Sequence, residues 1–173
     1  RVLPKLSESL SGREGSVRRK RAAILVLAAL GTQDAVHLLF HHLMLTPDSS
    51  IRFNLIWALN RIRASGERRE FDREIIHKEI FNEVERYVSI LSALQGYRKQ
   101  VPSPEMNGGT LWVVLEAMRI QNLERIFRLL ALLYAGDIIL VIYNRLSEPE
   151  PDPSVQAHAV ELLENVLEPR LAR

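Results

Sequence analysis

Apolar side chains recur along the chain at the three- and four-residue spacing of an α-helix, and the alternating pattern of a β-strand is absent. The pattern stops at turn residues such as Gly31, Pro47 and Gly66. We therefore expect an all-α protein of about 7–9 helices. Helices are predicted at 16–30, 33–45, 50–64, 71–98, 137–146 and 154–167. Residues 110–134 form one long helix or two that meet at Asn122, and residues 101–109, with two Pro and two Gly, form a loop.

The same spacing predicts which residues of each helix face the core. For helix 16–30 these are Val17, Ala22, Leu25, Ala28 and Ala29. For helix 33–45 they are Val36, Leu39, Phe40 and Leu43. For helix 71–98 they are Ile75, Ile76, Ile80, Val84, Tyr87, Val88, Leu91 and Leu94.

Three predicted helices begin with a shared pattern, which indicates internal repetition. The starts read Ser16-Val17-Arg18, Ser50-Ile51-Arg52 and Ser154-Val155-Gln156, and Pro-Asp stands shortly before the second and third. Each Ser is a predicted N-cap, and Asp137 is the predicted N-cap of helix 137–146. Repeated helix pairs that stack side by side bury a continuous core that no single pair could bury alone.

Residues 16–66 resemble HEAT-repeat proteins through these starts, through Leu30-Gly31-Thr32 and through Pro47-Asp48. The resemblance implies a HEAT-like α-α superhelix, that is, a solenoid of stacked antiparallel helix pairs. It also implies that Asp48, Arg18 and Arg52 form a ladder between neighbouring repeats, which lapses where Gln156 replaces Arg. The middle of the chain lacks the repeat signature.

Residues 110–168 are also similar to HEAT-like cytosolic regions of larger bacterial proteins, some of which have a nucleotide-transporter-like membrane part. The stretch Leu123–Tyr134, with Asp137-Ile138 and Ala159–Asn165, carries this similarity. The chain starts at Arg1, so we expect a fragment of a larger protein. We expect residues 1–173 to form a single HEAT-like domain: clear repeats at 16–66, a long helix plus loop at 71–109, and C-terminal repeats at 110–173.

Composition narrows the class of protein. The 173 residues are 47% hydrophobic, which excludes a disordered chain, and the absence of Cys excludes disulfide scaffolds, thiolate metal sites and cysteine catalysis. The longest unbroken apolar run, residues 22–30, is far shorter than the ~20 residues that span a bilayer. We therefore expect no membrane insertion by this segment and a cytoplasmic location, as a free protein or as the cytosolic part of a membrane-associated parent.

The net charge of +2 hides an asymmetry. Residues 1–69 carry 12 Lys and Arg against 5 Asp and Glu, whereas residues 70–173 carry 11 against 16. A basic half of this kind can bind an acidic protein surface or phosphates. The acidic second half argues against a continuous nucleic-acid track.

Several residue pairs could carry chemistry, and each is better explained structurally. His37 and His41 share a helix face but lack the Glu of a His-Glu-x-x-His motif, so we expect partly exposed histidines and no metal site. Glu79 and Glu83 are four residues apart on a long helix, where we expect a solvated face. Glu124 and Arg128 predict a structural ion pair.

Three further candidates are interpreted in the same way. The run Asn107-Gly108-Gly109 lacks the Lys and Ser or Thr of a phosphate loop, so a connector is expected. Trp57 with Arg61 could stack on a base, but core packing is favoured. No Ser-His-Asp arrangement of known spacing is present.

We therefore expect a noncatalytic protein–protein interaction or regulatory scaffold module that needs no cofactor. Its partner would be a protein or peptide, either acidic or another domain of the same parent chain. The candidate binding residues are taken to be exposed; they are Arg18, Arg19, Arg52, Asn60 and Arg61. The alternative is a nucleic-acid-binding HEAT-like protein, such as a HEAT-like DNA glycosylase, that uses the basic N-terminal half.

Overall fold

The chain is built from helices that follow one another with short connections. The computed structural model describes residues 2–11, 16–66, 68–101, 109–134 and 136–147, and the single positions Ser154, Ala157 and Glu161. These residues contain seven helices and no strand, which confirms the all-α prediction. The helices are α1 (Leu3–Ser11), α2 (Val17–Leu30), α3 (Gln33–Leu45), α4 (Ser49–Ala64), α5 (Arg73–Gln100), α6 (Thr110–Leu133) and α7 (Gly136–Leu146).

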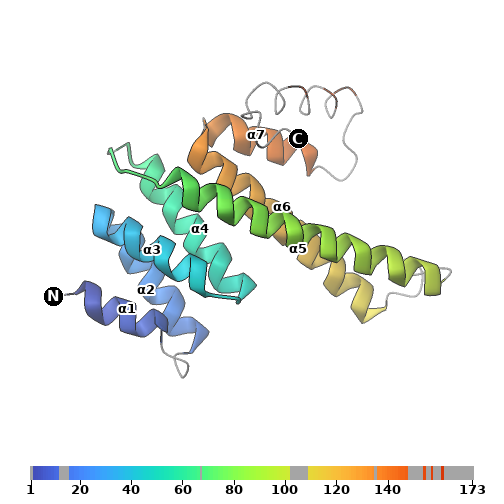
Figure 1. Ribbon diagram of the computed structural model, residues 1–173, viewed down its shortest axis with the longest axis horizontal. Coiled ribbons are helices and arrows are strands. Elements are labelled where there is room, and N and C mark those ends of the chain that lie inside the picture. The colour runs from blue at the N-terminus through green and yellow to red at the C-terminus, as the bar shows by residue number, and fades with distance from the viewer. Residues whose placement is uncertain are drawn as a thin grey trace.

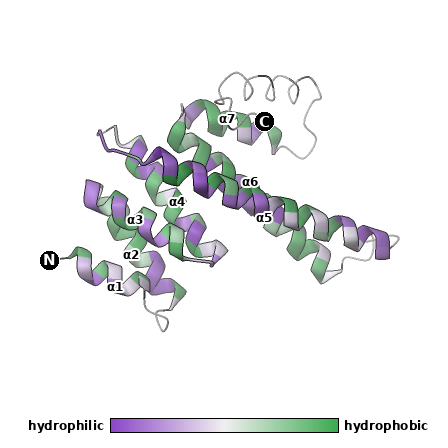
Figure 2. Cartoon of the chain, viewed as in Figure 1, coloured by the Kyte–Doolittle hydropathy of each residue, from purple (hydrophilic) through white to green (hydrophobic). Residues whose placement is uncertain are grey.

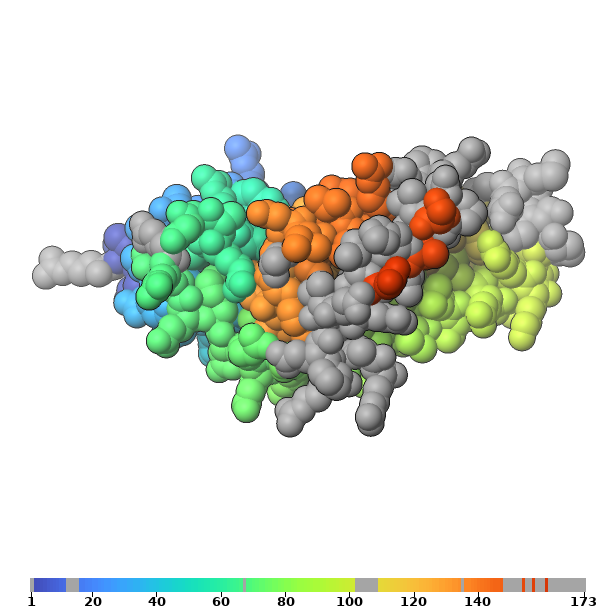
Figure 3. Space-filling view, turned by 90° about the horizontal axis from the view of Figure 1, so that it is seen from above, coloured from blue at the N-terminus to red at the C-terminus, as the bar shows by residue number. Residues whose placement is uncertain are grey.

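The N-terminal helices α1 to α4 pack as neighbours, and α6 joins them to the rest of the chain. The helix α2 contacts α1, α3 and α4, while α6 contacts α4, α5 and α7. Figure 1 shows that α5 and α6 run as a long pair, and that the C-terminal end of α5 and the N-terminal end of α6 project away from α1–α4. Seen from above in Figure 3, the same ends form one tip of an elongated molecule. We call this projecting part, residues 84–100 of α5 and 110–121 of α6, the arm.

Two helix boundaries were predicted correctly and two predicted caps were wrong. The Ser16 hydroxyl accepts a hydrogen bond from the Arg19 N–H, and Gly31 ends α2 with a left-handed φ of 59°. In α4 the cap is Asp48 rather than Ser50, because the Asp48 carboxylate, two residues earlier, accepts from two backbone N–H groups. Asp137, a predicted N-cap, lies inside the first turn of α7.

The core of the N-terminal part was predicted well for α3 and poorly for α2. In α3 the four predicted residues, Val36, Leu39, Phe40 and Leu43, are all buried. In α2 the buried residues are Ala23, Ile24, Leu27 and Ala28, so only Ala28 was predicted, and Leu25 is 50% exposed. The reason is that residues 22–30 are apolar on every side, so their spacing cannot identify the buried face.

The helix α1 was not predicted, although Leu3, Leu6 and Leu10 have helical spacing and all contribute to the core. The helix α5 runs on past Gly96 to Gln100. Its predicted core residues Ile76, Ile80 and Leu94 are buried, whereas Val84 and Val88 are exposed on a side of the arm that no described residue covers.

Residues 110–133 form one helix, and Asn122 lies buried within it. The C-terminal half of α6 is buried almost without interruption from Asn122 to Leu133. Figure 2 shows polar and apolar residues alternating along the labelled helices, as expected for helices with one face in a core. No described helix has both the length and the apolar character that crossing a membrane requires. Residues 102–108 of the loop predicted at 101–109, and nearly all of the predicted helix 154–167, lie outside the described residues.

Candidate functional site

Glu79 and Glu83 are buried in the structure, which corrects the prediction of a solvated face. Their side chains are 2% and 0% exposed. Arg52, predicted to be exposed on α4, is also buried, with 2% of its side chain accessible. These residues meet because one side of α5 packs against α6 and approaches α4. A buried charge is tolerated only where partners satisfy it, so the site is defined by its hydrogen bonds.

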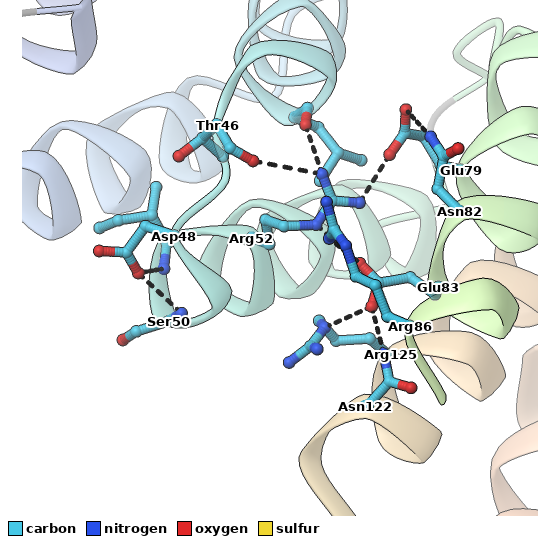
Figure 4. Close-up of polar contacts among 12 residues, drawn as sticks. Thr46, Asp48, Ser50, Arg52, Glu79, Asn82, Glu83, Arg86, Asn122 and Arg125 are labelled. Atoms are coloured by element: carbon cyan, nitrogen blue, oxygen red, sulfur yellow. Dashed lines mark hydrogen bonds and ion pairs between the residues drawn. The ribbon is translucent and has the colours of Figure 1, made fainter. Parts of the chain in front are cut away.

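The carboxylate of Glu83 is the centre of this buried cluster (Figure 4). Its Oε1 accepts from Arg52 Nε at 2.6 Å and from Arg86 Nη1 at 3.0 Å. Its Oε2 accepts from Arg125 Nε at 2.9 Å and from the amide of Asn122. One carboxylate on α5 therefore holds side chains from α4 and α6 together.

Arg52 uses its remaining donors on the other side of the cluster. Its Nη2 lies 2.6 Å from Glu79 Oε2, and its Nη1 donates to the backbone carbonyl of Leu43 at 2.7 Å. Arg52 thus links the end of α3 to α5. This arrangement replaces the predicted ladder, because Arg52 pairs with glutamates of α5 while Asp48 caps α4.

The charges of the cluster fix the protonation state of Glu83. Burial by itself would raise the pKa of this carboxyl, but the positive charges of Arg125 and Arg52 and their hydrogen bonds outweigh burial. The pKa of Glu83 therefore lies below its ordinary value of 4.5, and the group is ionised at neutral pH.

Two polar atoms in the cluster have no hydrogen-bond partner among the residues that the structure describes. They are Arg125 Nη1 and Asn122 Oδ1, both buried. Within the described part of the chain, the cluster joins three guanidinium groups, of Arg52, Arg86 and Arg125, to two carboxylates. One positive charge, one buried donor and one buried acceptor are therefore left unmatched among these residues.

A groove of about 560 Å³ opens beside Arg125. It lies between α5 and α6 at the start of α4, and the base of the arm forms part of it. Arg86 and Arg125 are both part of its wall. The other wall residues are Ser49, Asn82, Glu85, Ser89, Ile90, Met118 and Gln121. We call this space the arm groove.

The structure does not bring the predicted binding residues together. Arg18 and Arg19 are exposed at the start of α2. The start of α2 lies beside the start of α4, because Arg21 donates a hydrogen bond to the Ser50 hydroxyl at 2.6 Å. Asn60 and Arg61 lie near the opposite end of α4. A helix rises about 1.5 Å per residue, so roughly 15 Å separates the two pairs along α4.

Asn60 and Arg61 are also engaged within the fold. The Asn60 amide donates to the carbonyl of Arg128 on α6 at 2.9 Å, so it joins two helices. Arg61 is exposed, and its guanidinium lies 5.6 Å from the ring centroid of the half-buried Trp57. Both line a second cleft of about 380 Å³ between α4, α6 and α7. Their predicted role in binding stays a prediction.

The remaining candidates are explained by local contacts. His37 and His41 are exposed as predicted, and His37 shares a hydrogen bond with Gln33. Glu124 and Arg128 form the predicted pair, at 2.7 Å. Within the described ranges, no three His, Asp or Glu side chains gather as a metal site would require.

No family model, curated protein or solved structure matches this chain. Its function must therefore be argued from the arm groove and the surfaces around it. Sequence reasoning missed Arg86, Arg125 and Gln121. One signal was available, because Asn122 and Arg125 are polar residues three apart in the apolar half of α6.

Proposed function

We propose that the chain is a noncatalytic protein–protein interaction or scaffold module, and that its helix pairs form a HEAT-like solenoid with the arm as its contact surface. We place it in the cytoplasm. The arm carries large apolar side chains that no described part of the chain covers. Leu111, Val114 and Met118 on α6 are 45–55% exposed, and Val84 and Val88 on α5 are 39% and 54% exposed.

This apolar surface is the observation that carries the proposal. Leu111, Val114 and Met118 are spaced at i, i+3 and i+7, so they share one face of α6. Isolated exposed apolar residues are ordinary, but a row of them on a projecting helix pair is typical of a site that another protein covers. Met118 also belongs to the wall of the arm groove.

The test is photo-crosslinking in cells that naturally make the protein. A benzophenone amino acid at Met118 should give an adduct with a defined protein, which mass spectrometry identifies. The matched control is the same probe at Glu74, which is exposed in the first turn of α5, away from the arm. The identified partner is then purified and mixed with the purified chain. We expect a binary complex that Val114→Asp weakens at least tenfold without lowering the melting temperature.

Two results would overturn the proposal. One is an equal yield of the same adducts at Glu74 and at Met118, which would mean random encounters. The other is the absence of a protein adduct at any of the exposed apolar positions of the arm.

A further inference from the structure

We propose that the arm groove binds an acidic, amphipathic segment of a partner protein, with one carboxylate of that segment held between Arg86 and Arg125. This inference rests on the proposed function and adds the chemistry of the partner. It moves the expected acidic contact from Arg18, Arg19 and Arg61 to a site that the sequence did not indicate.

The first argument is charge. The buried cluster has one more guanidinium group than carboxylates, and the excess positive charge lies at the groove wall. Glu85, also on the wall, is exposed, and the Arg86 side chain is 40% exposed, so water screens both of these charges, whereas Arg125 is buried and its charge is screened far less. An incoming carboxylate would therefore balance the cluster.

The second argument is the supply of hydrogen-bond donors. Arg125 is 3% exposed, its Nε donates to Glu83, and its Nη1 is buried with no acceptor among the residues that the structure describes. The Arg86 side chain is 40% exposed, and a single nitrogen of it bonds to Glu83. Guanidinium groups bind carboxylates through two parallel hydrogen bonds, so these two arginines offer more donors than Glu83 can use.

The third argument distinguishes a protein segment from a small anion. Ile90 and Met118 give the groove apolar walls, and Met118 continues into the exposed row of Val114 and Leu111. A free anion would leave this row exposed to water. A helix or strand with apolar side chains and a terminal acidic residue would cover the row and place its carboxylate at Arg86.

The experiment measures the binding of a fluorescein-labelled peptide by anisotropy at fixed ionic strength. The peptide has about four helical turns, leucines at i, i+3 and i+7, and two glutamates at one end. Its control has glutamine in place of both glutamates. We expect the glutamate peptide to bind at least tenfold tighter, and Arg86→Gln to abolish the difference. The matched variant Arg61→Gln removes the same charge from another exposed arginine and should leave the difference unchanged.

A second variant keeps the test independent of the buried cluster. Gln121 is an exposed wall residue, so Gln121→Trp should fill the groove and block the peptide without disturbing Glu83. Melting curves confirm that each variant folds. Equal weakening by Arg86→Gln and Arg61→Gln, or unaltered binding to Gln121→Trp, would overturn the proposal.

Inorganic phosphate and glutarate are the competing probes. If either displaces the peptide at concentrations close to those of the peptide itself, the groove is a small-anion site and the inference is wrong. The two proposals fail differently. Absent adducts at the arm remove the proposed function, whereas a crosslinked partner whose affinity is unchanged by Arg86→Gln removes only this inference.

Discussion

Replacing Glu83 by Gln removes the negative charge at the centre of the buried cluster and nearly keeps its shape. Two buried guanidinium groups, of Arg52 and Arg125, would then lose their shared counter-charge. Removing one partner of a buried ion pair costs about 3–5 kcal/mol, because the remaining charge stays buried without compensation. For a chain of this size, each kcal/mol lowers the melting temperature by about 2–4 °C. We therefore expect Glu83→Gln to lower it by roughly 6–20 °C.

The assay is thermal and urea denaturation followed by circular dichroism at neutral pH. The matched control is Glu85→Gln, the same substitution two residues along α5 at an exposed position. It should change the free energy of unfolding by less than about 0.5 kcal/mol. Adding Arg125→Met to Glu83→Gln should cost less than the sum of the two single changes, because the second change removes a charge that the first left unpaired. If Glu83→Gln were as mild as Glu85→Gln, the buried cluster would be refuted.

Three further outcomes follow from the structure. The pKa of Glu83 is lowered in the folded state, so its stabilising contribution is complete above pH 4.5 and is lost as the pH falls through the folded pKa. Urea titrations should therefore show that the difference in unfolding free energy between wild type and Glu83→Gln shrinks below pH 4.5. Burial, and then the charges of His41 and Lys20, lower the pKa of His42. The free energy of unfolding should therefore fall as the pH drops from 6.5 through the folded pKa. His42→Gln should make the free energy of unfolding less dependent on pH in this range, and an unchanged pH dependence would contradict the prediction. Gly31 has a φ of 59°, and nothing lies within 4 Å of where a Cβ would stand. Gly31→Ala should therefore lower the free energy of unfolding by about 1–2 kcal/mol through backbone strain alone, seen as a lower urea midpoint. A change near zero would count against the left-handed cap.

The sequence was most informative where one helix face differs sharply from the other. In α3 the apolar residues lie on one side, and every predicted core residue is buried. In α2 the run from Ala22 to Leu30 has no polar side, so only the contacts with α1, α3 and α4 determine that Ile24 is buried and Leu25 is exposed. The spacing of apolar residues there predicts a helix, but it does not predict which face of the helix is buried.

The buried cluster could not be predicted from the local sequence pattern, for a different reason. Glu79 and Glu83 stand in the first half of α5, residues 73–86, where every turn carries charged residues and solvation is the ordinary outcome. They are buried because Arg52 and Arg125 approach from α4 and α6, 31 and 42 residues away from Glu83 in the sequence. Pairing over such separations depends on how helices stack, which one sequence does not reveal.

The proposed site requires that Arg86 and Arg125 donate hydrogen bonds to a partner carboxylate in the arm groove. Nitrogen NMR of the arginine side chains, recorded while the peptide is added, tests this most directly. We predict that the signals of Arg86 and Arg125 shift with the glutamate peptide, shift far less with the glutamine peptide, and leave that of Arg61 in place. Shifts confined to Arg61, or equal shifts with both peptides, would contradict the claim.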